Sequence, residues 1–405
     1  MPLIQPFRAL RPAPGRAADI LAPPYDVLSS AEARQRALGK PWSFLHVSKP
    51  EIDLDPGIDP YDPAVYEMAA TNLKRMIAEG VLIRDAAPRY YVYRLTREGR
   101  AQTGVAAIAS LAYYATNRIR KHELTTPVKE DDRVRQIEAI NAQTGPVMMA
   151  HPDAPEVDEL LARAAVGPAA VDVTADDGVR HQLWVIENQA AIDALTRAVD
   201  ALPALYIGDG HHRTAAAARV AEARGDGPAG YFLSVIFPYR EMTILDYNRV
   251  LKDLNGRTPE QILTALGETF SVAANAEAVR PAAPGEFGMF LAGKWYRLTI
   301  RPAFIPASDP IGRLPITLLS RHVIEPLFGI ADQRKDKRID FVGGGRGLNE
   351  LERRVLSGEM AIAFALHPTS MSDLMAVADA GEIMPPKSTW FEPKLADGMV
   401  SHVLD

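Results

Sequence analysis

IGDGHHRTAAAARVAEARG, residues 207–225, joins the end of an apolar strand to a glycine-flanked group of ionisable residues and then to an alanine-rich run. The apolar residues before it indicate a strand, and the alanine-rich segment indicates a helix. A helix cap needs one polar residue, whereas this corner has an aspartate, two histidines and an arginine. The stretch therefore predicts a strand-to-helix junction that carries a functional site.

Backbone and side-chain donors at this corner suit an anion. Gly208 and Gly210 allow a sharp turn and a close approach to a ligand. The following helix begins with unpaired N–H groups and a partial positive charge, which attract phosphate or carboxylate. Arg213 can add a bidentate contact, and Thr214 lies in the same turn. We assign these four residues to a phosphate-binding site.

The ionisable residues between the glycines and the arginine are the candidate catalytic groups. His211 and His212 can donate to a phosphate oxygen or transfer a proton near neutral pH. Asp209 can accept a hydroxyl proton, hold Mg²⁺, or only cap the helix. The sequence does not decide between these three roles of Asp209.

A second charged segment, RKHELTTPVKEDDR, covers residues 120–133. Thr126 followed by Pro127 indicates a helix start. Lys129 and Arg133 are four residues apart and so share a helix face, where they can neutralise phosphate charge. A solvated, salt-bridged helix start is the alternative interpretation.

The same segment supplies three more candidates. Glu123 is a candidate general base or metal ligand, and we expect His122 and Thr125 to contact substrate. Asp209 and Glu123 are the candidate metal ligands, but the sequence does not tell whether they share one pocket.

Two proline-rich segments add candidate substrate contacts. APPYDV, residues 22–27, places Tyr25 and Asp26 on a stiff turn. PPKSTWFEPK, residues 385–394, offers Lys387, Ser388 and Thr389 without the glycines of a Walker A loop. FVGGGRG, residues 341–347, lacks dinucleotide-binding spacing and is interpreted as a flexible turn.

Composition limits the classes of protein. The 405 residues are 47% hydrophobic and 24% charged, with net charge −6 and no cysteine. The absence of cysteine excludes disulfides, thiolate metal sites and a catalytic thiol. The acidic balance argues against a nucleic-acid partner. Without a signal peptide or a long apolar run, we expect a cytoplasmic protein with no membrane partner; a homodimer is the base-rate expectation.

Strands and helices are mixed without a regular βαβ alternation, which favours the α+β (mixed α/β) class. We expect three segments: 1–100, an N-terminal α/β segment; 101–255, a core with the DGHHR site; and 256–405, a C-terminal α/β domain. Helices are expected at 64–79, 156–165 and 189–201 and from Thr126–Pro127, where Gly145–Pro146 closes the helix. Strands are expected at 89–95, 104–114, 181–187 and 231–237.

Two resemblances add to this interpretation. DGHHR with its small-residue helix resembles the phosphate-binding signature of the ParB/sulfiredoxin-like fold, in particular of the free-serine kinases. That resemblance implies a catalytic role for Asp209 and phosphate contacts for His211, His212 and Arg213. APPYDV, HELT with KEDDR, YIGDGHHRTAAA and MPPKSTWFEPKL together resemble the domain-of-unknown-function family 1015. We therefore expect a ParB/sulfiredoxin-like core with additional N-terminal and C-terminal α/β segments.

The expected function is a phosphotransferase that moves phosphate between a nucleotide, ATP or ADP, and a small hydroxylated or phosphorylated metabolite, with serine a candidate and Mg²⁺ as cofactor. The first alternative is a phosphatase acting on a metabolite such as phosphoserine, with water as the acceptor. The second is a non-catalytic, nucleotide- or nucleic-acid-binding ParB-like module.

Overall fold

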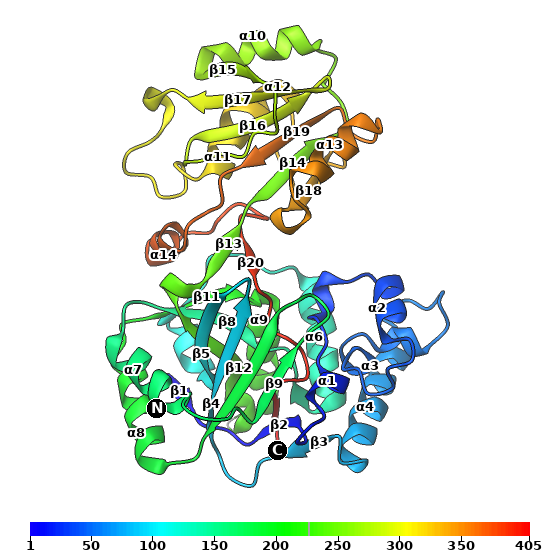
Figure 1. Ribbon diagram of the computed structural model, residues 1–405, viewed down its shortest axis with the longest axis vertical. Helices are drawn as coiled ribbons and strands as arrows, with labels where there is room; N and C mark the ends of the chain where they lie inside the picture. Colours follow the sequence, from blue (N-terminus) through cyan, green and yellow to red (C-terminus); the bar gives the residue numbers. More distant parts are fainter. Residues whose placement is uncertain (226) are drawn as a thin grey trace. The chain divides into compact units, whose positions relative to one another are not determined.

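The computed structural model describes residues 1–225 and 227–405 (Figure 1). Its contacts divide the chain into two compact units: unit 1 is Met1–Met242 with Pro393–Asp405, and unit 2 is Thr243–Glu392. Unit 2 is therefore inserted into the chain of unit 1. The sequence-based division at 100/101 and 255/256 stays a prediction.

The main sheet of unit 1 has the strand order β6-β11-β8-β12-β5-β4-β10-β9, with β1 on β5. The pairs β6–β11 and β8–β12 are parallel, and the other pairs in this sheet are antiparallel. The strands are β1 Ile4–Gln5, β4 Tyr90–Arg97, β5 Arg100–Ser110, β6 Ile119–Arg120, β8 Val147–His151, β9 Val171–Thr174, β10 Arg180–Ile186, β11 Leu205–Asp209 and β12 Tyr231–Pro238.

A smaller sheet of unit 1 has the order β3-β2-β21-β7, so it joins the two ends of the chain. Its strands are β2 Ala9–Pro12, β3 Leu82–Arg84, β7 Ala142–Gln143 and β21 Ser401–Val403. The helices of unit 1 are α1 Ala17–Ile20, α2 Ser30–Ala37, α3 Leu45–Ser48, α4 Pro63–Ala78, α5 Leu111–Ala115, α6 Pro127–Ile140, α7 Pro155–Ala164, α8 Gln189–Asp200 and α9 His211–Arg224.

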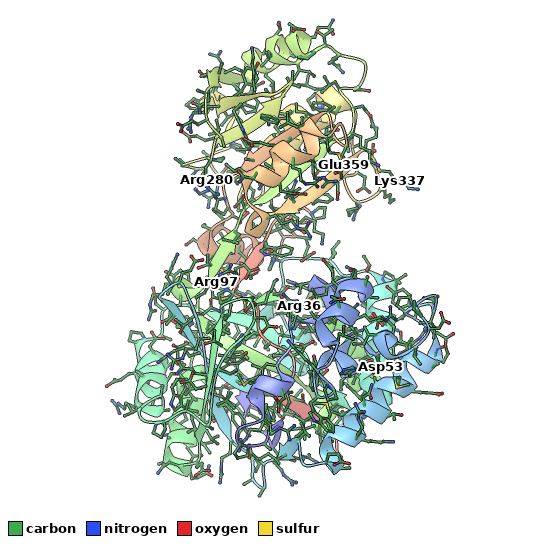
Figure 2. All side chains as sticks on the ribbon, turned by 45° about the vertical axis from the view of Figure 1, so that its right-hand side comes forward. Arg36, Asp53, Arg97, Arg280, Lys337 and Glu359 are labelled. Atoms are coloured by element: carbon green, nitrogen blue, oxygen red, sulfur yellow. The ribbon has the colours of Figure 1, made fainter. Side chains whose placement is uncertain are left out.

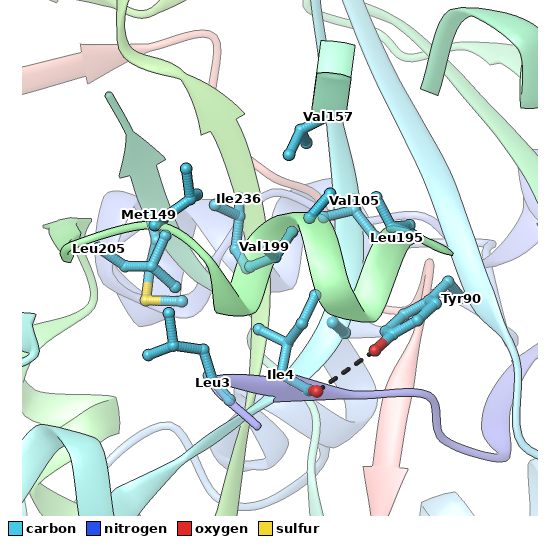
Figure 3. Packing of buried hydrophobic residues seen from close by; sticks show 14 of the residues in the cluster. Leu3, Ile4, Tyr90, Val105, Met149, Val157, Leu195, Val199, Leu205 and Ile236 are labelled. Atoms are coloured by element: carbon cyan, nitrogen blue, oxygen red, sulfur yellow. Dashed lines mark hydrogen bonds between the residues drawn. The ribbon is translucent and has the colours of Figure 1, made fainter. Parts of the chain in front are cut away.

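The core of unit 1 forms where amphipathic helices cover the main sheet (Figure 3). In α8, Leu195 and Val199 are one turn apart and face the same cluster as Val105 and Ile236 of the sheet. The Tyr90 hydroxyl donates a hydrogen bond to the Ile4 carbonyl at 3.3 Å. This contact ties the N-terminal strand to the core.

A separate cluster packs α6 on α9. Ile137 of α6 lies against Ala216 and Val220 of α9. The small side chains that make residues 215–218 helical also let α6 approach closely. This packing brings the two charged segments of the sequence together.

Unit 2 contains an antiparallel sheet with the order β15-β17-β16-β19-β14-β18, and a separate pair, β13 with β20. Its strands are β13 Thr243–Leu245, β14 Tyr247–Leu251, β15 Phe270–Asn275, β16 Glu286–Leu291, β17 Lys294–Ile300, β18 Ile339–Gly343, β19 Ile362–Leu366 and β20 Trp390–Glu392. Its helices are α10 Pro259–Thr269, α11 Pro315–Leu319, α12 Glu325–Phe328, α13 Leu348–Leu356 and α14 Met371–Asp379.

Charged side chains of both units lie mainly at the surface (Figure 2). The labelled Arg280 and Glu359 of unit 2 keep 66% and 43% of their side chains exposed. Within residues 1–225 and 227–405, no helix has both the length and the apolar character needed to cross a membrane.

The mixed α/β class predicted from the sequence is confirmed. Most expected elements form within a few residues of their predicted bounds, but two differ. The segment 104–114 leaves the strand after Ser110 and ends in α5. Helix α6 ends before the predicted Gly145–Pro146, because Asn141 adopts the left-handed conformation with φ 50°.

The turn at 341–347 is packed on its neighbours. A Cβ on Gly343 would lie 3.1 Å from the Trp390 ring, and one on Gly344 would lie 2.3 Å from the Asp246 carboxylate. Glycine is needed there for close approach, which differs from the flexible turn that the sequence indicated.

The Gly104→Ala substitution should destabilise unit 1. A Cβ on Gly104 in β5 would lie 2.4 Å from the Ile236 carbonyl oxygen and 2.7 Å from the Phe237 ring. Because backbone cannot easily move aside, we expect a loss of about 2–3 kcal/mol in the free energy of unfolding. Urea unfolding would measure it. Gly230→Ala is the matched control, since a Cβ on Gly230 meets no atom within 4 Å; equal losses in both variants would contradict the close approach.

Candidate functional site

The corner between β11 and α9 is a one-residue turn. Gly210 links the strand to the helix with φ 105° and ψ 26°, in the left-handed region that favours glycine. The register of β11 on β8 shifts between Ile207 and Asp209, so Gly208 lies in a bulge. No side chain of the described residues caps the helix N-terminus by a hydrogen bond. The bulge and the turn place Asp209 directly before the first N–H groups of α9.

Asp209 is held ionised by two cations. Its carboxylate lies 3.2 Å from Nη2 of Arg213 and 3.4 Å from Nζ of Lys394. Burial opposes ionisation, but Lys394 and Arg213 outweigh it and hold the pKa of Asp209 well below its usual value. The group is therefore an anion and a hydrogen-bond acceptor at neutral pH.

The guanidinium of Arg213 is clamped between two glycines. A Cβ on Gly210 would lie 3.0 Å from its Cζ, and a Cβ on Gly145 would lie 3.2 Å from its Cδ. Nη1 donates to the Pro146 carbonyl, while Nε is buried without a partner among the described residues. Both glycines thus give room to a side chain that is 11% exposed.

The two histidines anchor the loop before α6. Nε2 of His211 accepts a hydrogen bond from the His122 N–H at 3.4 Å, and Nε2 of His212 accepts one from the Thr126 N–H at 3.2 Å. A neutral imidazole that accepts at Nε2 carries its proton on Nδ1. Burial, and next the neighbouring His122, lower the pKa of His211 well below its usual value.

His122, Glu123 and His211 form a compact cluster. The rings of His122 and His211 are perpendicular, with centroids 4.5 Å apart, and Nδ1 of His211 lies 3.8 Å from Oε2 of Glu123. Burial lowers the pKa of His122 to about 4, so it is neutral at pH 7. Asp209 raises the pKa of both histidines electrostatically. Glu123 contacts the His211 ring, and Asp209 stands two positions before His211 in the chain, so both carboxylates are neighbours of this histidine.

Several predicted residues line one cleft of about 240 Å³. It contains Tyr25 and Asp26 of the stiff turn, Lys129 and Arg133 of α6, and His212 of α9. The Arg133 guanidinium stacks 3.8 Å from the Tyr25 ring centroid. The further residues lining the cleft are Ser48, Lys49, Pro50, Glu51, Pro60, Tyr61, Val65, Tyr66, Asp132 and Gln136.

A cavity of about 30 Å³ is lined by Tyr25 and Arg133 together with Arg213 and Asp397. Its size suits ordered water. Because Arg213 also contacts Asp209, this cavity links the cleft to the corner. Burial raises the pKa of Asp397 to about 7 against the opposing effect of Arg213.

The remaining predicted residues have other surroundings. Thr125 donates to the Glu130 carboxylate, and Thr214 is buried and donates to the Gly210 carbonyl at 3.3 Å. Lys387, Ser388 and Thr389 belong to unit 2. There Ser388 donates to the Pro385 carbonyl at 2.5 Å, and the Lys387 ammonium lies 5.8 Å from the Tyr247 ring centroid.

Lys394 and Asp397 are the site residues that sequence reasoning missed. Lys394 stands in the segment MPPKSTWFEPKL, where its charge is a signal that the sequence does contain. Asp397 gives no signal in the sequence, because its burial depends on an antiparallel bridge to Ala22, far away along the chain.

A family model matches most of the chain. The model described as "Protein of unknown function (DUF1015)" matches residues 4–317. The chain belongs to this family. The DUF1015 resemblance inferred from the sequence is therefore confirmed. A search of curated proteins finds no match to this DUF1015 protein.

Solved structures similar to the DUF1015 chain include a free serine kinase in complex with AMP, with 15% identity, TM-score 0.37, and coverage of 71% of this chain and 86% of that chain. A mutant of free serine kinase in complex with ADP has 14% identity, TM-score 0.35 and coverage of 71% and 87%. SbnI with a C-terminal truncation, from Staphylococcus aureus, has 11% identity, TM-score 0.38 and coverage of 72% and 85%. With TM-scores below 0.5 and identities of 11–15%, these similarities carry no argument about the reaction.

The Asp397→Asn substitution should change how stability depends on pH. With its pKa raised to about 7, native Asp397 keeps a proton that the unfolded chain releases near pH 4, so stability falls as pH rises through this window. Asparagine cannot ionise. Between pH 5 and pH 8 we expect the wild type to lose about 2–3 kcal/mol more than the variant. Urea unfolding at both pH values measures this, and equal changes would contradict the raised pKa.

Proposed function

We propose that this DUF1015 protein is a phosphotransferase that moves phosphate between a nucleotide, ATP or ADP, and the hydroxyl group of a small metabolite, with serine as the first candidate. The observation that carries the proposal is the corner itself. An uncapped helix N-terminus, a clamped guanidinium and an ionised carboxylate lie within five consecutive residues there. Phosphoryl transfer depends mainly on such positioning and charge neutralisation.

The phosphate has a natural position at the start of α9. The N–H groups of the first turn and the helix dipole favour an anion there. Arg213 adds a fixed positive charge, and Lys129 and Arg133 line the neighbouring cleft. The cleft therefore suits the part of a ligand that extends beyond the transferred phosphate.

Asp209 is the group that we place beside the reacting hydroxyl. Its carboxylate can accept the hydroxyl hydrogen while the new P–O bond forms and the P–O bond to the nucleotide breaks. Lys394 keeps this carboxylate ionised, so it is a weak base that mainly orients the nucleophile. A loose phosphoryl-transfer transition state places little demand on base strength.

The two histidines support this corner through hydrogen bonds. Both Nε2 atoms already accept backbone N–H groups. A phosphohistidine at either Nε2 would require the loop 122–126 to leave α9. This favours direct transfer to a hydroxyl over a phosphatase that uses a phosphohistidine.

In the part of the chain that the structure describes, the group with metal-ligand spacing is not the oxygen-rich set that Mg²⁺, the expected cofactor, prefers. The Asp209 carboxylate is engaged by Arg213 and Lys394. The group whose geometry suits a metal is His122, Glu123 and His211, of which two members offer nitrogen. These residues therefore do not fit Mg²⁺.

Phosphorus NMR of the purified protein tests the proposal. One sample contains serine with ATP or ADP, and another contains phosphoserine alone. A new phosphomonoester signal that requires nucleotide supports a phosphotransferase. Free phosphate released from phosphoserine without nucleotide would overturn the proposed phosphotransferase and indicate a phosphatase.

The Asp209→Asn substitution should lower kcat by about 100-fold or more, because the neutral amide neither orients the hydroxyl as the carboxylate does nor takes its proton. Nucleotide-dependent phosphomonoester formation measures the effect. Asp176→Asn makes the same chemical change at an ion pair whose carboxylate is 71% exposed, and it should leave kcat unchanged. Full activity in Asp209→Asn would remove the proposed role.

The Lys394→Met substitution should shift the pH profile. Lys394 is the leading cation that lowers the pKa of Asp209, so its removal raises that pKa. Activity that needs ionised Asp209 is lost as pH falls through its pKa. The acidic limb of kcat/KM should therefore move to higher pH, and an unmoved limb would contradict the assignment.

A further inference from the structure

The cluster of His122, Glu123 and His211 joins the residues after β6 to the start of α9. Each residue offers one ligand atom, and these atoms lie within 4.8 Å of one another. Among the residues that the structure describes, this is the group with metal-ligand spacing. Spacing alone does not make a metal site, so the state of each imidazole matters.

His122 is an imidazole whose ring nitrogens lack a hydrogen bond of good geometry. It is 1% exposed, and neither Nδ1 nor Nε2 has a well-aligned hydrogen-bond partner in the described chain. The Ile207 backbone lies near enough to raise the pKa of the ring, but not in the alignment that a hydrogen bond requires. An unsatisfied buried polar group costs about 1–3 kcal/mol. Such a ring next to another imidazole and a carboxylate points to a ligand that completes the cluster.

The other buried histidines differ from His122. Nδ1 of His151 bonds to the Pro152 carbonyl at 2.7 Å. Nδ1 of His181 bonds to the Tyr93 hydroxyl at 2.8 Å, and Nε2 of His402 bonds to the Pro228 carbonyl at 3.0 Å. Each of these rings is satisfied in part by the protein, so the orphaned ring of His122 is a local feature of the cluster.

The distances suit a metal ion after a small closure. Two ligand atoms at about 2.0–2.2 Å from a tetrahedrally coordinated ion lie about 3.3–3.6 Å apart. Nδ1 of His211 and Oε2 of Glu123, at 3.8 Å, are within a few tenths of an ångström of this separation. The other separations, all within 4.8 Å, must shorten by roughly 1 Å, which small movements of two side chains can share.

The donor set decides the kind of ion. Two imidazole nitrogens and one carboxylate oxygen suit Zn²⁺ and other divalent transition metals, whereas Mg²⁺ prefers oxygen ligands. We propose that His122, Glu123 and His211 form a binding site for a divalent transition-metal cation of the Zn²⁺ class, and that this site discriminates against Mg²⁺.

Metal binding would break one hydrogen bond of the loop 122–126. If Nδ1 of His211 coordinates the ion, Nε2 carries the ring proton and no longer accepts the His122 N–H, so the 3.4 Å contact must open. Metal loading should therefore increase hydrogen exchange of the His122 amide. This readout is independent of any enzymatic activity.

Three protein ligands leave coordination positions open, as in catalytic metal sites. A phosphate oxygen at the start of α9 can occupy one of them. This last step rests on the proposed phosphotransferase function, in which proton acceptance then belongs to Asp209 while Glu123 binds the ion. The binding of the metal itself does not depend on that function.

Calorimetric titration of the chelator-treated full chain tests the site without nucleotide or substrate. We expect one Zn²⁺ to bind per chain, with Mg²⁺ bound at least 100-fold more weakly. Co²⁺ in the same site should give visible absorption typical of low coordination number. His122→Ala and Glu123→Gln should each weaken Zn²⁺ binding tenfold or more. His367→Ala in unit 2, whose Nδ1 faces the Pro368 carbonyl, should leave it unchanged.

Glu123→Gln keeps the test decisive if His122→Ala fails to fold, because the Glu123 side chain is 39% exposed. Unchanged Zn²⁺ affinity in Glu123→Gln, or Mg²⁺ affinity equal to that of Zn²⁺, would overturn the proposal. Asp209→Asn should strongly reduce phosphate transfer and retain Zn²⁺ binding. In the wild-type protein, absence of phosphate transfer together with intact Zn²⁺ binding would overturn only the proposed reaction.

Discussion

The partly buried ion pairs of Asp209 with Arg213 and Lys394 are the constraint on which the site depends. The carboxylate belongs to β11, the guanidinium to α9 and the ammonium to the carboxyl-terminal segment. Removing one partner leaves the remaining charges without their counterion in a place that water reaches poorly. One carboxylate thus fixes three parts of unit 1 and sets the direction of the first turn of α9.

The two histidines connect this ion-paired corner to the start of α6. Because His211 and His212 accept backbone N–H groups of the preceding loop, the start of α6 is placed against the start of α9. The packing of Ile137 on Ala216 and Val220 continues the same contact along both helices. The cations of α6 therefore reach the cleft through rigid elements, which is how a site maintains its geometry.

The corner could be predicted from sequence because its signals are local. Glycine at 210, an aspartate before it and an alanine-rich helix after it all act within a few residues, and the structure has the strand, the turn and the helix there. The role of the histidines could not be predicted, since it depends on the loop 122–126 arriving from elsewhere. The burial of Asp397 could not be predicted either, because it arises from pairing with Ala22. Long-range contacts of this kind leave no periodic pattern in the sequence.

The insertion of unit 2 has a consequence for biosynthesis. The ribosome synthesises Met1–Met242 and then the whole of Thr243–Glu392 before it adds Lys394 and Asp397. Domains generally fold as units during synthesis, with N-terminal segments first. Until Lys394 has followed unit 2, Asp209 and Arg213 lack the third member of their ion pairs. The charged corner is therefore completed only after the whole of unit 2 has been synthesised.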